Sequence, residues 1–558
     1  MPWTQEYSPI GNSAGLSAAV AAVPLGVIFV CLAILRMKVA KSALIALATA
    51  FVLSVSCWGM PARLAGLATA QGAAFGLFPV FYIVLTTLFL FNITVKSGQF
   101  DIIRASLAGI TNDRRIQAVL VAFCFGAFVE GAAGFGAPVA IAGATLVALG
   151  FRPFYAAGIC LVANTAPVAF GSIGIPIVAM GGVVGLNDTE LMKLSATVGH
   201  QLPFISLIVP TYIILLMVGF RRTMEVLPAV AICGVTFAAC QWAVASYMGP
   251  YLPDILASIA SMAALMALLR FWQPSTVYRF EHDPAVEVVT QRFTGAQVFR
   301  AWSPYLALTV VVLLWGVPGV KAELNRATVM ISVPGLDNAI VRMPPALHPA
   351  AQSAIAHGGA PHLVPVPAKF KLDYLAASGT AAFFAALISA AICGLGAGET
   401  LALLGSTLRG LRSPALAISA VLALAYVMNA SGMTTCLGIF ATKAGSMFPL
   451  ISPVLGWLGV FLTGSDTSSN VLFGGLQKAA AEGLGINPLL TAAANTSGGV
   501  MGKMISPQSL AVACAATGLV GEEGSLFRFT FRHSLVLLSV VCVICYLQAY
   551  VLSWMIPS

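Results

Sequence analysis

The 558-residue chain is 59% hydrophobic and only 8% charged, with a mean hydropathy of +0.94. An ordinary soluble domain carries about 25% charged residues, so this composition excludes a soluble fold and predicts an all-α polytopic membrane protein. The formal net charge of +9 does not indicate nucleic-acid binding, because the Lys and Arg residues lie between apolar runs, where they orient membrane spans.

The first 15 residues are expected to form a short external N-terminus. They contain Glu6 but no Lys or Arg, and so lack the basic start of a cleavable signal peptide. We therefore expect the first apolar run to remain in the mature protein. The eleven cysteines are scattered without a CxxC pair or the spacing of a metal site, and are expected to be small packing residues. The sequence predicts no metal and no cofactor.

Ten apolar runs approach the length of about 20 residues that a helix needs to cross a hydrocarbon core of about 30 Å. Each is predicted to be one transmembrane helix. They lie at residues 16–35, 42–58, 73–95, 196–220, 227–248, 254–272, 301–317, 375–396, 414–432 and 531–556.

Four further apolar stretches are too long for one straight span, because a helix rises 1.5 Å per residue. They lie at residues 116–150, 154–185, 452–485 and 488–519. Each has a cluster of Gly, Pro, Ser or Thr near its middle, and these clusters span residues 130–138, 164–167, 464–470 and 495–499. We therefore predict that each stretch is a re-entrant hairpin or a broken helix.

Short patterns recur in the same order in both halves of the chain, which predicts an internal duplication. The four matches have nearly constant spacing: Ser97-Gly98 with Ser431-Gly432, Glu130 with Asp466, LGFRP at 149–153 with LGINP at 484–488, and NTx5Gx4P at 164–176 with the same pattern at 495–507. The first repeat is predicted at 16–222 and the second at 373–558. Connecting helices at 223–317 and an external loop at 318–372 separate them.

The positive-inside rule gives the two repeats opposite orientations. Arg36 and Lys38 place the first connection in the cytoplasm, so the span that ends before Ser97 also ends inside. Arg412 places the start of the 414–432 helix inside, and the matching Ser431 therefore lies outside. Inverted repeats of this kind are typical of secondary transporters that work by alternating access.

The predicted topology agrees with the positions of the basic residues if each repeat contains one re-entrant hairpin and one broken helix that crosses the membrane. This gives 12 crossings plus two re-entrant hairpins. These elements are predicted within 116–185 and 452–519. Arg152 favours 116–150 as the first hairpin, but exchanging the two labels is an open alternative.

Three histidines lie in the predicted external loop. His348, His357 and His362 could bind a metal, but a solvated loop explains their presence as well. We do not predict a metal site there.

Two carboxyl residues at matching places in the repeats are the candidates for proton coupling. Glu130 falls near the middle of a membrane segment, where a charge costs about 2.5–3.5 kcal/mol on insertion scales. Burial disfavours the ionised form, so protonation becomes accessible near neutral pH. Asp466 is the second candidate. Glu130 could instead brace the Gly-rich break, and Asp466 could instead cap the following helix.

Lys503 is the best candidate to bind an anionic substrate. A lone ammonium in a membrane segment needs an anionic partner, which could be a substrate carboxylate or, alternatively, Glu130 or Asp466. Ser506 and Gln508 are weaker candidates for contact with a substrate hydroxyl.

Two Asn-Thr pairs are also predicted to contact the substrate. Asn164, Thr165, Asn495 and Thr496 lie at the expected breaks, where unwound helix ends present N-H groups and positive half-helix dipoles to a carboxylate. They could instead satisfy backbone groups that the breaks leave open.

Three stretches that contain these residues closely resemble the bacterial lactate permease family. They are FCFGAFVEGAAGFGAPVAIAGATLVALGFRPFYAAGICLVANTAPVAFGSIGIPI (123–177), GWLGVFLTGSDTSSNVLF (456–473) and ANTSGGVMGKMISPQSLAVACAATGLVG (494–521). The resemblance covers most of the chain. It implies a multi-pass symporter of the bacterial cytoplasmic membrane that carries L-lactate, D-lactate or glycolate with protons, and is not an enzyme.

The Asn-Thr pairs also resemble those of the wider ion-transporter superfamily, which implies an elevator-like architecture and allows a homodimer. Two alternatives remain: a sodium-coupled carrier of another small carboxylate, and an anion channel. An intramembrane aspartyl protease is disfavoured, because such enzymes use two Asp residues with a Gly-x-Gly-Asp element, whereas Asp466 follows Gly-Ser and faces a Glu.

Overall fold

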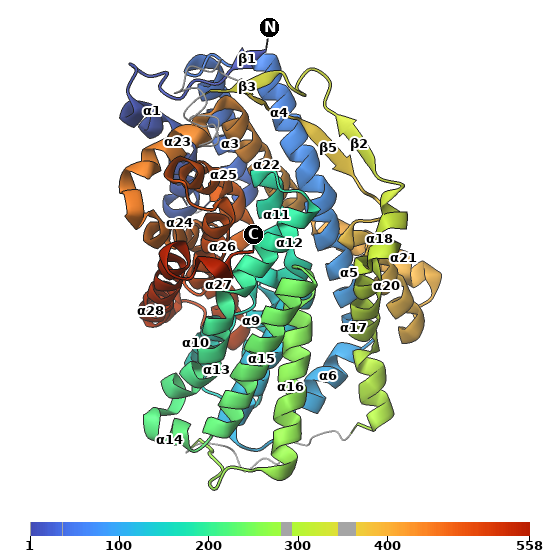
Figure 1. Ribbon diagram of the computed structural model, residues 1–558. Helices are drawn as coiled ribbons and strands as arrows, with labels where there is room; N and C mark the ends of the chain where they lie inside the picture. The colour runs from blue at the N-terminus through green and yellow to red at the C-terminus, as the bar shows by residue number, and fades with distance from the viewer. Residues whose placement is uncertain (1, 36, 135, 281–292, 344–363, 558) are drawn as a thin grey trace.

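The computed structural model describes residues 2–35, 37–134, 136–280, 293–343 and 364–557. The described chain is an elongated helical bundle (Figure 1). Its short strands gather near the end that carries the N-terminus, and the short helix α14 (Phe220–Met224) lies at the opposite end. Arg221 and Arg222 on α14 mark that opposite end as cytoplasmic under the positive-inside rule.

The elements of the first half follow one another closely. They are β1 (Trp3–Thr4), α1 (Ala14–Ala21), α2 (Val23–Phe29), η1 (Val30–Ile34), α3 (Val39–Ser56), α4 (Ala62–Phe75), η2 (Gly76–Phe81), α5 (Tyr82–Lys96), α6 (Gln99–Ala108), α7 (Arg114–Ala118), η3 (Val119–Phe125), α8 (Gly126–Ala132), α9 (Ala137–Ala148), α10 (Pro153–Ala163), η4 (Val168–Phe170), α11 (Gly171–Val184), α12 (Asp188–Gly199), α13 (Leu202–Val218), α14, α15 (Leu227–Tyr247) and α16 (Pro253–Phe271).

The second half begins with a long helix and continues through short strands to the C-terminal helices. Its elements are α17 (Gly295–Gly316), α18 (Pro318–Asn325), β2 (Val329–Ser332), β3 (Ile340–Arg342), β4 (Val364–Pro365), β5 (Lys369–Leu372), α20 (Ser378–Cys393), α21 (Ala397–Gly410), α22 (Arg412–Ser431), α23 (Met433–Ala441), η5 (Thr442–Met447), α24 (Phe448–Thr463), α25 (Asp466–Leu484), α26 (Pro488–Lys503), α27 (Pro507–Thr517), α28 (Glu523–Tyr550) and η6 (Ser553–Met555).

The predicted polytopic helical membrane protein is confirmed. Within the described residues, 11 helices are long and apolar enough to cross a membrane, or up to 12 if the bent pair α10 and α11 forms one span. Most of the predicted single crossings coincide with helices, and several of these are longer than the apolar run alone. The run at 196–220, for example, lies mostly within a segment that begins earlier and spans Asp188–Val218. The run at 375–396 contains only the shorter helix Ser378–Cys393, and the run at 73–95 is interrupted at Phe78, whose φ of −139° and ψ of 123° are not helical.

Three of the four predicted breaks are present. The first separates α8 from α9, and the turn there contains Gly134 and Gly136 at φ 59° and 84°, a backbone region that glycine adopts without strain. The second follows Asn164, where α10 and the helix beyond it are bent by 64°. The third lies at Gly464 and Ser465, between α24 and α25.

The fourth predicted break, at residues 495–499, is wrong. Helix α26 runs through this segment without interruption, and the chain leaves the helix only at Met504, before Pro507. Its glycines serve close packing: a Cβ on Gly498 would meet the backbone of Pro453 on α24. These glycines let α24 and α26 approach closely, and α26 stays helical through them.

The predicted external loop contains two small sheets in its described part. Strand β2 pairs antiparallel with β5, and β3 pairs parallel with β1 and antiparallel with β4. The N-terminal strand is thereby tied to this region. His348, His357 and His362 lie outside the described residues.

Helix α25 packs between the two halves of the molecule. It lies against α24 and α26 on one side and against α11 on the other. A chain of buried amides holds these contacts: Gln477 donates to Asn495 (3.1 Å), Asn495 donates to Asn470 (2.9 Å), and Asn470 donates to the carbonyl oxygen of Pro176 on α11 (3.1 Å). This network fixes the helices around the cavity described next.

Candidate functional site

A cavity of about 350 Å³ lies where the helix breaks meet. Its inner wall comes from α8, from the segment between α10 and α11, and from the adjoining ends of α24, α25 and α26. Its outer wall includes Lys38 before α3 and Ser413 on the first turn of α22. Both of these positions lie on the cytoplasmic side under the positive-inside rule.

The chain between α10 and the regular part of α11 has an irregular backbone. Ser172, Ile173 and Gly174 have φ values of 44°, 56° and 70°, which is a strained conformation for a β-branched residue such as Ile173. The Ser172 hydroxyl donates to the carbonyl oxygen of Ala133 at 2.9 Å. That bond connects this break to the break that follows α8.

Glu130 on α8 is 3% exposed and lines the cavity. Its Oε2 has no hydrogen-bond partner in the described part of the chain. Gly171 lies directly against the carboxyl group, and a Cβ there would fall 2.6 Å from Oε1. The site therefore has room for the Glu130 carboxyl only because residue 171 has no side chain.

Asp466 begins α25 and also lines the cavity. The alternative that it caps this helix is wrong, because Ser465 is the N-cap and its hydroxyl accepts from the backbone N-H of Ser468 at 3.2 Å. Both carboxyl oxygens of Asp466 are buried without a hydrogen-bond partner among the described residues. Asp466 is thus a second buried carboxyl that no described residue satisfies.

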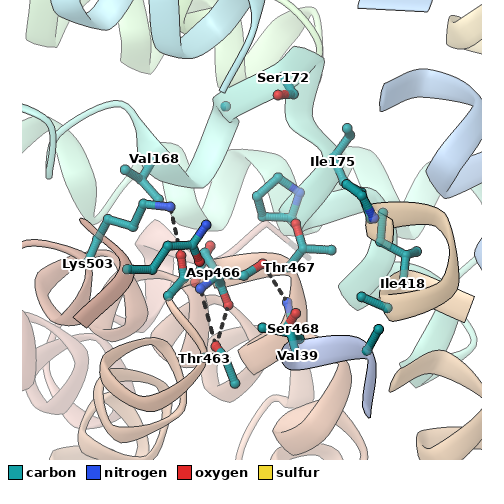
Figure 2. A pocket seen from close by; sticks show the side chains of 18 of the residues that line it. Val39, Val168, Ser172, Ile175, Ile418, Thr463, Asp466, Thr467, Ser468 and Lys503 are labelled. Atoms are coloured by element: carbon teal, nitrogen blue, oxygen red, sulfur yellow. Dashed lines mark hydrogen bonds between the residues drawn. The ribbon is translucent and has the colours of Figure 1, made fainter. Parts of the chain in front are cut away.

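Lys503 ends α26 and points into the same cavity (Figure 2). Its Nζ donates to the carbonyl oxygen of Gly464 at 2.8 Å. Glu130 and Asp466 both lie near enough to attract it, but neither reaches the 4.0 Å of an ion pair in the described structure. The ammonium is therefore held by a neutral carbonyl group and is not neutralised by direct contact with either carboxyl.

Glu130, Asp466, Lys503 and Gln508 all line this cavity. The sequence therefore identified the two carboxyls, the cation and one amide that the fold brings together, although three of them are more than 300 positions from Glu130 in sequence. Gln508 is exposed within the first turn of α27 and approaches Gly464.

The other predicted substrate contacts do not line the cavity. Asn495 is engaged in the amide network, and Thr496 donates to Ala492 within its own helix at 3.3 Å. Ser506 is the N-cap of α27, where its hydroxyl accepts from the N-H of Ser509 at 3.2 Å. A direct role for these residues in substrate binding stays a prediction.

The first Asn-Thr pair lies behind Glu130. Thr165 donates to Val162 at 2.7 Å, whereas neither polar atom of the Asn164 side chain has a hydrogen-bond partner among the described residues. Asn164 lies close to the Glu130 carboxyl. The Asn164 side chain is therefore placed where it can interact with the Glu130 carboxyl.

Several residues of the site were missed by sequence reasoning. Ser172, Thr467 and Ser468 line the cavity, and Asp254 lies buried behind Glu130. The polar run after Gly464 was a visible signal for the two α25 residues. Asp254 gave no such signal, because an acidic residue at the start of an apolar run is also typical of a membrane interface.

Within the described residues, one cavity of this helical membrane protein holds a cation and two carboxyls with which the cation does not pair, an arrangement typical of a transporter of a small charged solute. The chain belongs to the L-lactate permease family, whose family model matches residues 17–552. It is a permease and not an enzyme, and it is a multi-pass protein of the bacterial inner membrane.

The chain matches curated relatives over their whole length. It is 48% identical to an L-lactate permease of Bacillus subtilis, 46% to an L-lactate permease of Escherichia coli, and 45% to the Glycolate permease GlcA of Escherichia coli, each over 100% of both chains. Among solved structures, the YdaH transporter of Alcanivorax borkumensis aligns over 88% of each chain with 14% identity and a TM-score of 0.45.

Proposed function

We propose that this protein takes up L-lactate, D-lactate or glycolate together with protons. The relatives named above are L-lactate permeases and a glycolate permease, and both substrates carry a carboxylate beside a hydroxyl. The observation that carries the proposal is the position of Lys503, which lies in a cavity with Glu130 and Asp466 but forms an ion pair with neither.

Lys503 and the first turn of α25 would bind the substrate carboxylate. A hydrogen bond between an ammonium and a carboxylate is roughly twice as strong as one between neutral groups, so the substrate can replace the Gly464 carbonyl as the partner of Lys503. The N-terminus of α25 faces the same cavity and adds a partial positive charge. Gln508 and Ser468 supply polar groups for the 2-hydroxyl.

Glu130 would carry the coupled proton, with Asp466 as a second carrier. A buried carboxylate without a partner is unfavourable in a membrane segment, whereas a protonated carboxyl is not. When a monoanion occupies Lys503, the cation no longer stabilises a negative charge on Glu130. Substrate binding therefore favours protonation of Glu130, and one proton with one monoanion moves no net charge.

The cavity would represent an inward-facing state. It leads toward the cytoplasmic ends of α3 and α22, whereas a second cavity of about 350 Å³ lies at the opposite end of the α11–α25 pair, beside Lys478 and Arg342. Between these two cavities, α11 and α25 pack against each other, and the Asn470 side chain donates a hydrogen bond to the carbonyl oxygen of Pro176. We propose that inverted repeats at 16–222 and 373–558, with hairpins and broken helices at 116–185 and 452–519, move this site in an elevator-like manner.

Transport by purified protein in liposomes tests the coupling. An inward-directed pH gradient should drive accumulation of labelled lactate, and a membrane voltage alone should have little effect. Glu130→Gln should lose accumulation but keep exchange of lactate for lactate. Normal pH-driven accumulation by this variant would remove Glu130 from the coupling role.

The same liposomes separate the two alternatives. Accumulation that needs a sodium gradient and ignores the pH gradient would replace the proton symporter with a sodium-coupled carrier. Labelled lactate should also show saturable counterflow against unlabelled lactate. An anion channel would show none.

A further inference from the structure

Asp254 is a second buried acid next to the proposed proton carrier. It lies in the first turn of α16, its exposed fraction is 1%, and it does not line the transport cavity. Neither carboxyl oxygen has a hydrogen-bond partner among the described residues. A carboxyl this deeply buried and unsatisfied calls for an explanation.

Asp254 packs against the helical turn that carries Glu130. Helix α16 lies on α8, and a Cβ on Gly131 would fall 2.8 Å from the Cβ of Asp254 and 3.0 Å from Cγ1 of Ile255. Glycine at position 131 therefore allows α16 to approach α8 closely. As a result, two unpartnered carboxyls occupy adjoining turns of two helices.

Among the described residues, the helices that pack most closely against α16 carry no cation near Asp254 that could balance an ionised carboxyl. The elements packed most closely against α16 are α15, η3 and α8, and their titratable groups are Cys233, Cys240, Tyr247, Cys124 and Glu130. Of these, Glu130 interacts electrostatically with Asp254. Beyond Glu130 lies Lys503, which attracts that carboxyl from the cavity side. The N-terminal dipole of α16 offsets only part of the cost of burying the charge.

Asp254 lies on the external side of Glu130. Arg222 before α15 and Arg270 at the end of α16 place the far ends of both helices in the cytoplasm, so the turn between α15 and α16 faces outward. Tyr251 in this turn interacts electrostatically with Asp188, which pairs with Lys371 at 2.9 Å and Lys321 at 3.4 Å. The turn that begins α16 therefore has Glu130 near its Asp254 and a partly exposed charge cluster near its Tyr251.

We propose that Asp254 is a second proton-binding site, which passes protons between the external side and Glu130. In this step the O-H bond of protonated Asp254 breaks and an O-H bond forms on ionised Glu130, so one proton moves and the total charge of the pair is unchanged. Asp254 then takes a new proton from the external side. The inference rests on the proposed proton symport.

Asp254→Asn in the full-length protein tests this role in liposomes. The amide has nearly the same shape but cannot exchange a proton. Accumulation driven by a pH gradient should be lost, and lactate counterflow at equal pH on both sides should be retained. Ser258→Ala, one turn further along α16, removes a buried hydroxyl that bonds to Ile255 within the same helix, and should change neither measurement.

The outcomes separate this inference from the proposed function. If the unmodified protein ignores the pH gradient, proton symport itself fails. If the unmodified protein responds and Asp254→Asn responds equally, only the role of Asp254 is overturned. If a folded Asp254→Asn variant loses both counterflow and accumulation, Asp254 is needed for substrate movement. This result would also overturn its role as a proton-binding site.

Labelling of the unmodified protein keeps the proposal testable if Asp254→Asn fails to fold. Dicyclohexylcarbodiimide modifies protonated carboxyls in apolar surroundings, and mass spectrometry of peptides identifies the modified residue. Asp254 should be modified at acidic pH and less so at alkaline pH. A protein that is modified at Glu130 but not at Asp254 at acidic pH would contradict the proposal.

Discussion

Gly171 lies so close to Glu130 that a Cβ at position 171 would fall 2.6 Å from Oε1 and 3.3 Å from Cδ of the carboxyl. The backbone of Gly171 has φ −59° and ψ 152°, a conformation that alanine adopts without strain. Gly171→Ala therefore acts on the Glu130 side chain and not on the local backbone. It should displace the carboxyl from its position in the cavity.

We expect Gly171→Ala to reduce pH-driven lactate accumulation by about 10- to 100-fold, because a displacement of about 1 Å can cost that much in a positioned site. Gly66→Ala on α4 is the matched control, since no atom lies within 4 Å of a Cβ there. It should leave transport unchanged and, as a helix-interior Gly→Ala change, should not lower stability. Equal transport by both variants would show that the position of Glu130 is not critical.

Lys503→Met should weaken binding of lactate. A hydrogen bond to a charged group contributes about 1.5–3 kcal/mol, which corresponds to about 10- to 150-fold in the dissociation constant. Binding of labelled lactate to the purified protein measures the change directly. Lys193→Met on α12 is a control outside the cavity, and a similar loss in that variant would show that Lys503 has no specific role.

Asn495→Ala should lower stability and leave lactate binding nearly unchanged. The substitution leaves the buried Nε2 of Gln477 and Oδ1 of Asn470 without one partner each, and an unsatisfied buried polar group costs about 1–3 kcal/mol. Thermal unfolding in detergent and equilibrium binding measure the two effects separately.

Thr496→Ala is the control for this prediction. Its hydroxyl bonds only to Ala492 in the same helix, at 3.3 Å, so its loss should have a smaller effect on unfolding. A large loss of affinity in Asn495→Ala with normal stability would support Asn495 as a substrate contact.

The two Asn-Thr pairs show what the sequence could and could not predict. The same pattern precedes a 64° bend after Asn164, whereas Asn495 lies inside a continuous helix. Glycine gives the same sequence signal whether it allows a turn or lets helices pack closely, and only the contact with Pro453 reveals which applies at Gly498. Composition therefore predicted the class of fold, but not which pair marks a break.

The sequence predicted a site residue where its charge was unusual for the apolar segment around it. Glu130 and Lys503 are charges inside apolar stretches, and the fold brings both into one cavity. Asp254 occupies the edge of an apolar run, where a carboxylate is ordinary. It becomes anomalous only because Gly131 allows α16 to bury it against α8, which is a tertiary contact that no local pattern encodes.

Arg115 holds the cytoplasmic end of α7 by a network that should contribute strongly to stability. The side chain is 0% exposed and contacts Asp113, itself 1% exposed, at 2.7 Å and Glu225 at 2.6 Å. It also donates to the carbonyl oxygen of Thr276 at 2.7 Å. Arg115 therefore connects α7 to the chain segments that follow α14 and α16.

Arg115→Met leaves Asp113 buried without its cation, and loss of one partner of a buried ion pair costs about 3–5 kcal/mol. The expected result is a large decrease in the unfolding temperature in detergent. Arg104→Gln is the matched control, because its 3.3 Å pair with Asp101 is exposed and such pairs contribute about 0–1 kcal/mol. Similar unfolding temperatures for the two variants would contradict a structural role for the buried network.

The network also predicts how stability depends on pH at the cytoplasmic surface. The hydrogen bond from Arg115, with a second from Thr276, holds the pKa of Glu225 below its ordinary value of 4.5. A carboxyl whose pKa is lower in the folded protein contributes stability above its unfolded pKa, and loses that contribution as the pH falls through the folded pKa. The unmodified protein should therefore be more stable than Glu225→Gln near neutral pH, and this difference should shrink as the pH falls below 4.5. Unfolding temperatures of both proteins across this range measure the difference, and a constant gap would show that ionised Glu225 contributes nothing to it.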